Sequence, residues 1–163
     1  MNVIALATWI VTASLGLYLL SIWLIEYDKD FQADAATSLP PLVLASHVTL
    51  GVGGLIVWAY YLFFDNDGLA YVATGAVLLG ASLGTYMAFR WYYVYRAKRQ
   101  LQQLERLSNA GPRLAVAVLD RPASARTGPP ERNFPLPVVV SHGVFATATI
   151  VLVVLTAFGV GGS

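Results

Sequence analysis

Four long blocks of apolar residues constrain this chain more than any other feature of its sequence. Each block can cross the hydrocarbon core of a bilayer, which needs about 20 helical residues, and most charged residues lie between the blocks. A soluble protein has too little polar surface to cover so much apolar sequence. We therefore predict an all-α integral membrane protein with a single domain, residues 1–163. The predicted membrane helices are about 3–25, 41–64, 69–95 and 135–160.

The residues before and between these blocks set the expected path of the chain. Only Met1 and Asn2 precede the first block, and neither is basic. A cleaved signal peptide carries a basic segment at that point, so we expect the first block to remain as a membrane helix. Residues 65–68 read Asp-Asn-Asp-Gly, which predicts a tight polar turn. The order of the blocks gives an up-down-up-down path.

The positions of the positive charges predict the orientation in the membrane. Lys and Arg collect in cytoplasmic connections. In this chain they lie in or beside the first and third connections, and none lies near the termini or in the turn at 65–68. We predict that the first and third connections are cytoplasmic, that both termini are outside, and that the membrane is a bacterial-type plasma membrane. The cationic residues are Lys29, Arg90, Arg96, Lys98, Arg99, Arg106, Arg113, Arg121, Arg126 and Arg132.

The third connection, residues 96–134, is long and basic. Residues 96–108 have leucines at helical spacing and are predicted to extend the third membrane helix. The segment that follows is rich in Gly, Pro and Arg, and its apolar run 114–119 fits either an interfacial strand or a contact site. The connection is suited to anionic lipid or a cytoplasmic-side protein partner. We do not expect nucleic acid as a partner, because the basic residues line the membrane.

The sequence contains an internal repeat. Residues 13–27 and 81–95 read ASLGLYLLSIWLIEY and ASLGTYMAFRWYYVY and are identical at seven of fifteen positions, where composition alone gives roughly one or two. Residues 39–47 and 134–142 read LPPLVLASH and FPLPVVVSH. The offset is 68 residues in the first pair and 95 in the second, so an insertion of 27 in the third connection explains the difference. We infer a four-helix bundle built from a duplicated two-helix hairpin, with the copies parallel.

His47 and His142 are the only histidines in the chain, and they occupy matching positions in the repeat. Each lies seven residues after the matched proline near the start of its helix, or about 10 Å along a helix. A polar side chain at that depth in a membrane is costly and usually functional. The alternative is that each imidazole only hydrogen-bonds a neighbouring helix. A duplicated hydrogen-bonding residue would give the same sequence pattern.

In a ring of four helices, the repeat places the two histidine helices on a diagonal of roughly 12–14 Å. That gap suits two imidazoles that bind one haem iron from opposite sides. A porphyrin between them needs small side chains along its faces, although small residues also allow close helix packing without a cofactor. The small residues predicted to line the porphyrin are Ser14, Gly16, Gly51, Gly54, Ser82, Gly84, Ala146 and Thr149.

Arg90 breaks the repeat, because its counterpart is Ile22. One interpretation is a salt bridge from its guanidinium to a haem propionate. The other, which we favour, is an arginine near the helix end that extends its charged group to the interface.

The four-span layout and the two histidine positions resemble those of the membrane-bound b-type cytochromes, which include the anchor subunits of succinate dehydrogenases. The resemblance implies axial ligation of one haem b per chain by His47 and His142. It implies an electron carrier within the membrane, as a subunit of a respiratory or quinone-linked complex, rather than a stand-alone catalyst. A quinone and other membrane or cytoplasmic-side protein subunits are the redox partners to expect.

Two other interpretations stay open at this stage. In one, the protein is a cofactor-free accessory or scaffold subunit whose basic connection binds a partner, and the histidines only join helices. In the other, the matched residues Tyr18 and Tyr86 approach the histidines and form a His–Tyr metal site. The chain has no cysteine, which removes disulfides, thiolate metal sites, iron–sulfur clusters and c-type haem. It also carries no hydrolytic motif.

Overall fold

Four long helices and one short 3-10 helix make up the described part of the protein. The structure is a computed structural model and describes residues 1–27, 37–64, 66–108 and 129–160. No strand occurs among these residues, so the predicted all-helical fold is confirmed. In chain order the elements are α1 (Asn2–Glu26), α2 (Pro41–Phe64), α3 (Asp67–Ser108), η1 (Pro130–Asn133) and α6 (Leu136–Ala157).

All four long helices are long and apolar enough to cross a membrane. Their outward faces carry large apolar side chains, such as Ile25, which is 82% exposed, and Phe63, which is 85% exposed. A water-soluble bundle would turn such residues inward, because each one buried contributes about 1.5–3 kcal/mol. An outer surface of this kind matches the hydrocarbon of a bilayer, as predicted from the length and composition of the apolar blocks.

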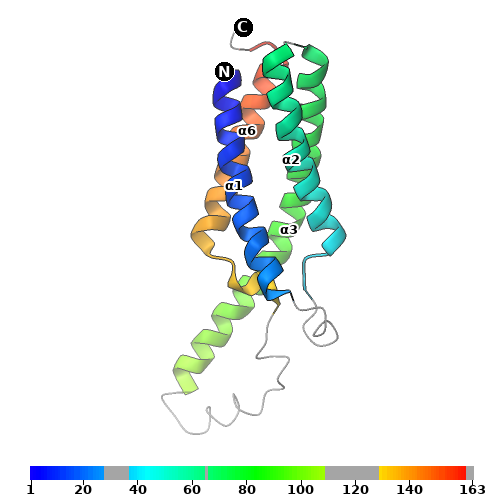
Figure 1. Ribbon diagram of the computed structural model, residues 1–163. Helices are drawn as coiled ribbons and strands as arrows, with labels where there is room; N and C mark the ends of the chain where they lie inside the picture. Colours follow the sequence, from blue (N-terminus) through cyan, green and yellow to red (C-terminus); the bar gives the residue numbers. More distant parts are fainter. Residues whose placement is uncertain (28–36, 65, 109–128, 161–163) are drawn as a thin grey trace.

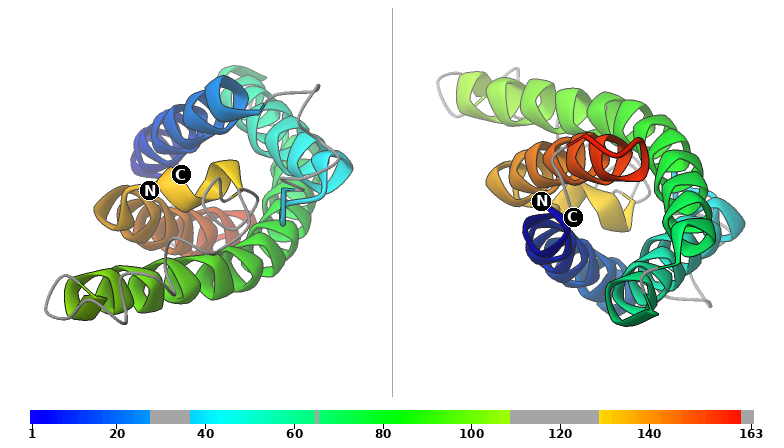
Figure 2. Two further views of the ribbon diagram at one scale, coloured as in Figure 1. Left: turned by 90° about the horizontal axis from the view of Figure 1, so that it is seen from below. Right: turned by 90° about the horizontal axis from the view of Figure 1, so that it is seen from above.

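The helices form a ring in the order α1, α2, α3 and α6 (Figures 1 and 2). The closest packing is between α2 and α3 and between α1 and α6. The packing of α1 on α2 and of α3 on α6 is looser, and within the described residues the diagonal pairs α1–α3 and α2–α6 make no contact. The bundle therefore consists of two tight helix pairs that face each other across its centre. The histidine helices α2 and α6 lie on a diagonal.

The turn between α2 and α3 is shorter than the sequence predicted. Asp67 and Gly68 already belong to α3. Asn66 caps this helix, because its Oδ1 accepts a hydrogen bond from the Gly68 amide at 2.9 Å. An asparagine at this position satisfies a backbone N–H that the first helical turn leaves unpaired. Asp65, the first residue of the predicted turn, lies outside the described residues.

The helix α3 continues well past the end of the bundle (Figure 1). Near the point where it leaves the bundle, the Lys98 amine donates a hydrogen bond to the Arg132 carbonyl at 3.0 Å. Some residues of the first and third connections fall outside the described part of the chain: Lys29, Arg113, Arg121, Arg126 and the apolar run 114–119.

Two clusters of buried side chains close the two ends of the bundle. Near the N-terminus, Trp9 and Trp58 pack with their ring centroids 6.4 Å apart, and the Trp58 indole donates to the Asn2 carbonyl at 3.2 Å. Near η1, the buried residues are Trp23, Leu39, Leu44 and Met87. The space between these clusters contains the histidines.

Candidate functional site

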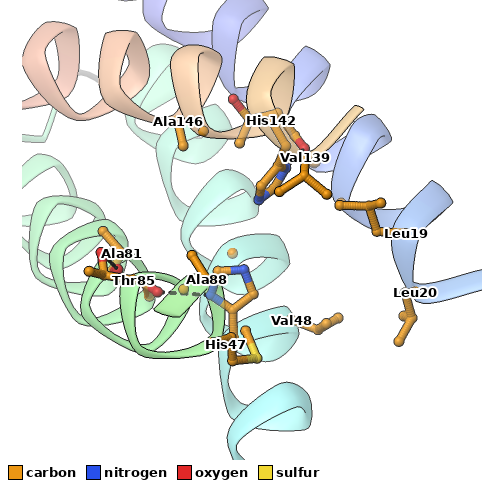
Figure 3. Close-up of a pocket in the computed structure, with 18 of the residues that line it drawn as sticks. Leu19, Leu20, His47, Val48, Ala81, Thr85, Ala88, Val139, His142 and Ala146 are labelled. Carbon is orange, nitrogen blue, oxygen red and sulfur yellow. Dashed lines mark hydrogen bonds between the residues drawn. The ribbon is translucent and has the colours of Figure 1, made fainter. Parts of the chain in front are cut away.

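A cavity of about 360 Å³ lies in the centre of the ring, between the two buried clusters (Figure 3). All four long helices contribute to its lining, which is mostly aliphatic and aromatic. A concave, largely apolar space with a few convergent polar groups is typical of a ligand or cofactor site. The polar groups that converge here are the two imidazoles, together with the side chains of Thr12, Thr85, Thr147 and Thr149.

His47 and His142 face each other across this cavity (Figure 3). Their ring centroids are 6.2 Å apart, and the ring planes are inclined at 68°. They come from diagonal helices that do not touch, so the space between the imidazoles is not filled by backbone. Residues far apart in the sequence thus place two identical side chains on opposite walls of one cavity.

Each imidazole is fixed by a backbone carbonyl of the helix beside its own. The Nδ1 atom of His47 lies 2.8 Å from the Gly80 carbonyl oxygen, and that of His142 lies 2.9 Å from the Thr12 carbonyl oxygen. A carbonyl has no proton to give, so Nδ1 must carry the hydrogen in both rings. In the neutral imidazole, Nε2 is then the unprotonated nitrogen with a free lone pair.

Glycines make room for both rings. A Cβ atom added at Gly84 would lie 2.9 Å from Cε1 of His47, and one at Gly16 would lie 2.9 Å from Cε1 of His142. Carbon atoms do not approach that closely, so the rings lie directly against helix backbone. The sequence predicted these two glycines as porphyrin contacts. The structure places them against the imidazoles and in the lining of the cavity, and their contact with a porphyrin stays a prediction.

The two histidines contact residues that align with each other in the repeat. Thr12 and Gly80 are 68 residues apart, as are Gly16 and Gly84, and the histidines are 95 apart. Nearly every residue that lines the cavity has its aligned counterpart in the lining too, and Thr149 and Ile150 are the exceptions. The site therefore has an approximate twofold arrangement, in which each histidine contacts a helix of the other hairpin.

In the part of the chain that the structure describes, the two free nitrogens have no protein partner. Within the described residues, neither Nε2 atom takes part in a hydrogen bond, and no Lys or Arg lines the cavity. Two free imidazole nitrogens in one cavity are suited to bind an electron-pair acceptor placed between them, such as a metal ion. The described residues contain no group of three or more His, Cys, Asp or Glu side chains that could hold a bare ion.

The other small residues predicted for the site divide into two groups. Gly51 and Ala146 line the cavity, and so does Thr149. Gly54 does not, because it packs against Trp9, with an added Cβ only 2.8 Å from Cζ2 of that ring.

The side chains of Ser14 and Ser82 also lie away from the cavity, on the exposed faces of their helices. Each hydroxyl donates to a carbonyl four residues earlier in its own helix, at 2.8 and 2.9 Å. That internal bond satisfies a hydroxyl facing outward.

Arg90 does not line the cavity either. Its Nε donates to the Ser38 carbonyl, and its Nη1 donates to the Tyr86 hydroxyl at 2.8 Å. The guanidinium is thus occupied at the η1 end of the bundle and on its outside. Tyr86 and Tyr18 are 44% and 50% exposed and lie outside the cavity lining, so the structure does not bring them to the histidines.

The chain was compared with family models, with curated proteins and with solved structures. None of them matches.

Sequence reasoning missed two features, one at the site and one outside the cavity. One is the pair of carbonyls at Thr12 and Gly80, which any residue type could supply. The one signal in the sequence is their position, because Thr12 and Gly80 align in the repeat and each lies one helical turn before an aligned glycine. The other is Glu131, a fully buried carboxylate in η1. It stands alone among prolines, arginines and asparagine in the sequence, with no pattern to mark it as buried.

Proposed function

We propose that this protein is a membrane-embedded b-type cytochrome that carries electrons through one haem b bound between His47 and His142. The observation that carries the proposal is that His47 and His142 lie on opposite walls of one apolar cavity (Figure 3), each with a free Nε2. Each is left free because a carbonyl holds the Nδ1 proton of the same ring. Ligand histidines are commonly oriented in this way, and the second bond also makes the ring a stronger donor.

The spacing of the rings supports one shared iron. An imidazole nitrogen binds a metal ion at about 2 Å, so two rings on opposite sides of one ion have centroids roughly 6 Å apart. The centroids of His47 and His142 are 6.2 Å apart.

The remaining residues of the cavity fit the other needs of a porphyrin. Only two ligands come from the chain, and a porphyrin supplies the other four nitrogens of a six-coordinate iron. When bound, haem supplies reversible one-electron chemistry. The protein's own contributions are the two imidazoles, the small residues Gly51 and Ala146, and an apolar wall that keeps water from the iron.

We also infer that the bundle is a duplicated two-helix hairpin. The support is that the two histidines make equivalent contacts. Thr12 and Gly80, which align in the repeat, each place a carbonyl at Nδ1 of one histidine, and Gly16 and Gly84, which also align, each lie against one ring. Duplication explains why a single chain presents two equal ligands to one site. Function commonly gathers at the interface between such repeats.

The cavity's position suggests where electrons are exchanged. The histidines lie in the half of the bundle that contains η1 and the basic end of α3, which the distribution of Lys and Arg assigns to the cytoplasm. We propose a bacterial-type plasma membrane, both termini outside, and redox partners that are a quinone or another subunit on the cytoplasmic side. We propose an electron-transfer component rather than a stand-alone catalyst.

An absorption spectrum of the protein, expressed in a haem-producing host and purified in detergent, tests the proposal. We expect the sharp bands of a reduced low-spin b-type haem at about one haem per chain. Correctly folded protein without these bands contradicts it.

Replacement of the ligands sharpens this test. We expect His47→Gly and His142→Gly each to abolish the six-coordinate spectrum, and free imidazole to restore it by entering the space left by the ring. A matched control is Ser14→Gly, which removes a side chain exposed on the surface of α1 and should leave the spectrum unchanged. A six-coordinate low-spin spectrum that persists in both histidine variants without imidazole rules out axial ligation by this pair.

A second candidate function is a cofactor-free scaffold subunit. The observation in its favour is the part of α3 that projects beyond the bundle (Figure 1) and carries the exposed residues Arg96, Arg99 and Arg106. Such a helix offers a basic surface to a partner. This candidate predicts that replacing both histidines with Gln leaves partner association intact and removes no cofactor.

A further inference from the structure

The two imidazoles are crossed as well as opposed. Their planes are inclined at 68°, and this angle follows from how each ring is held. Because His47 is bound to α3 and His142 to α1, the two rings take their orientations from different helices. In a bundle with approximate twofold symmetry, nothing requires these orientations to be parallel.

Two contacts restrict the rotation of each ring about its bond to Cβ. The carbonyls of Gly80 and Thr12 fix the direction of Nδ1, at 2.8 and 2.9 Å. The glycine one turn later lets the Cε1 edge rest against backbone, where an added Cβ would be 2.9 Å away. A ring held at one nitrogen and along the adjoining edge has little freedom to turn. The protein thus sets the orientation of the rings independently of any cofactor.

We propose that the carbonyls of Thr12 and Gly80, together with Gly16 and Gly84, are positioning groups that hold two axial imidazoles crossed on one haem iron. This inference rests on the proposed function and goes beyond it, because ligation alone does not fix the angle between the rings. Each ring donates π density to the iron d orbital perpendicular to its plane. Two parallel rings raise the energy of the same d orbital. Two crossed rings each raise the energy of a different d orbital, so these two orbitals stay close in energy.

The electronic consequence can be measured directly. Near-equal d orbitals give ferric low-spin haem a strongly anisotropic electron paramagnetic resonance spectrum with one very large g value. Parallel rings give a rhombic spectrum with three well-resolved g values. We expect the anisotropic spectrum from the oxidised, haem-loaded full chain. A rhombic spectrum, from a sample whose absorption bands show bis-histidine haem, overturns the inference but leaves the proposed function intact. Absence of haem from folded protein contradicts the proposed function itself.

The glycines can be tested separately from the ligands. Gly84→Ala pushes a methyl group against the His47 ring, so we expect the largest g value to shift while haem remains bound. Gly75→Ala is the matched control, because it lies on the same helix and an added Cβ meets nothing within 4 Å; its spectrum should equal that of the unmodified protein. An unchanged spectrum in Gly84→Ala removes the positioning role of this glycine. If that variant fails to retain haem, Gly16→Ala gives the equivalent test at His142, and the unmodified protein still decides whether the rings are crossed.

Discussion

The carboxylate of Glu131 accepts hydrogen bonds from both the backbone amide and the hydroxyl of Ser38. Glu131 lies in η1 just before α6, and Ser38 lies just before α2. The Thr37 hydroxyl donates to the same carboxylate at 3.0 Å. The two histidine helices therefore start from one polar junction, which fixes their starting points relative to each other and so the depth at which each imidazole enters the cavity.

Removal of the Glu131 carboxylate should destabilise the protein substantially. In Glu131→Ala, the amide and hydroxyl of Ser38 lose their acceptor in a partly buried place, and an unpaired buried donor costs about 1–3 kcal/mol. Glu131→Gln keeps one acceptor oxygen and should lose less. Thermal unfolding in detergent, followed by circular dichroism, measures both.

The matched control for this junction is Glu26→Ala. Glu26 is an exposed carboxylate at the end of α1, and its removal should change the unfolding temperature little. Equal unfolding temperatures for Glu131→Ala and Glu26→Ala would show that the junction does not stabilise the fold.

Packing at Gly54 gives a second prediction, in which adjacent glycines behave differently. A methyl group at Gly54 would meet Cζ2 of Trp9 at 2.8 Å and the Ala76 Cβ at 3.1 Å, whereas one at Gly53 meets nothing within 4 Å. Overpacking of a tight contact costs about 1–3 kcal/mol. We expect Gly54→Ala to lower the free energy of unfolding by that amount in a denaturing-detergent titration, and Gly53→Ala to leave it unchanged or raise it. The opposite order would contradict the packing described for Trp9.

The helices could be predicted from sequence because hydrocarbon imposes a simple rule on length and polarity. Four apolar blocks gave four helices, and the ends of α2 at Pro41 and Phe64 agree with the prediction. The sequence predicts a start at residue 69, because Asp67 and Gly68 are typical turn residues, whereas α3 starts at Asp67. Once Asn66 supplies a cap, these two residues can occupy the first helical turn.

The finer division of the small residues could not be predicted. Gly51 and Gly54 are three residues apart and share a helix face, yet one lines the cavity and the other packs against an indole. The difference depends on Trp9, whose indole Nε1 donates to the Gly51 carbonyl at 3.0 Å and places the ring over Gly54. Helical periodicity predicts the face on which each residue lies. It does not predict which side chain from another helix packs against that face.

The cavity itself can be filled by mutation without touching the histidines. Ala146→Phe adds a ring to a lining position, so we expect haem per chain to fall at least several-fold while the helical content stays the same. Val144→Phe is the control on the same helix, because Val144 is 62% exposed on the outer face. The pyridine haemochrome assay, normalised to protein, compares them. Equal haem content in both variants would place the cofactor elsewhere.

The orientation of the chain can be tested by single cysteines, because the natural sequence contains none. Gln103 is exposed on the projecting part of α3, and Asn66 is exposed in the turn before that helix. These positions lie at opposite ends of a helix long enough to cross the membrane. We expect a membrane-impermeant maleimide to label Asn66→Cys in intact cells, and to label Gln103→Cys only after the membrane is opened.

Both labelling patterns carry a functional consequence. The expected pattern puts η1, the basic end of α3 and the nearer ends of the histidine helices on the cytoplasmic side, where a soluble electron donor could approach them. The reverse pattern, with Gln103→Cys labelled in intact cells, would contradict the orientation inferred from Lys and Arg. In that case, electrons would have to be exchanged at the outer face, although the ligand geometry between His47 and His142 would be unaffected.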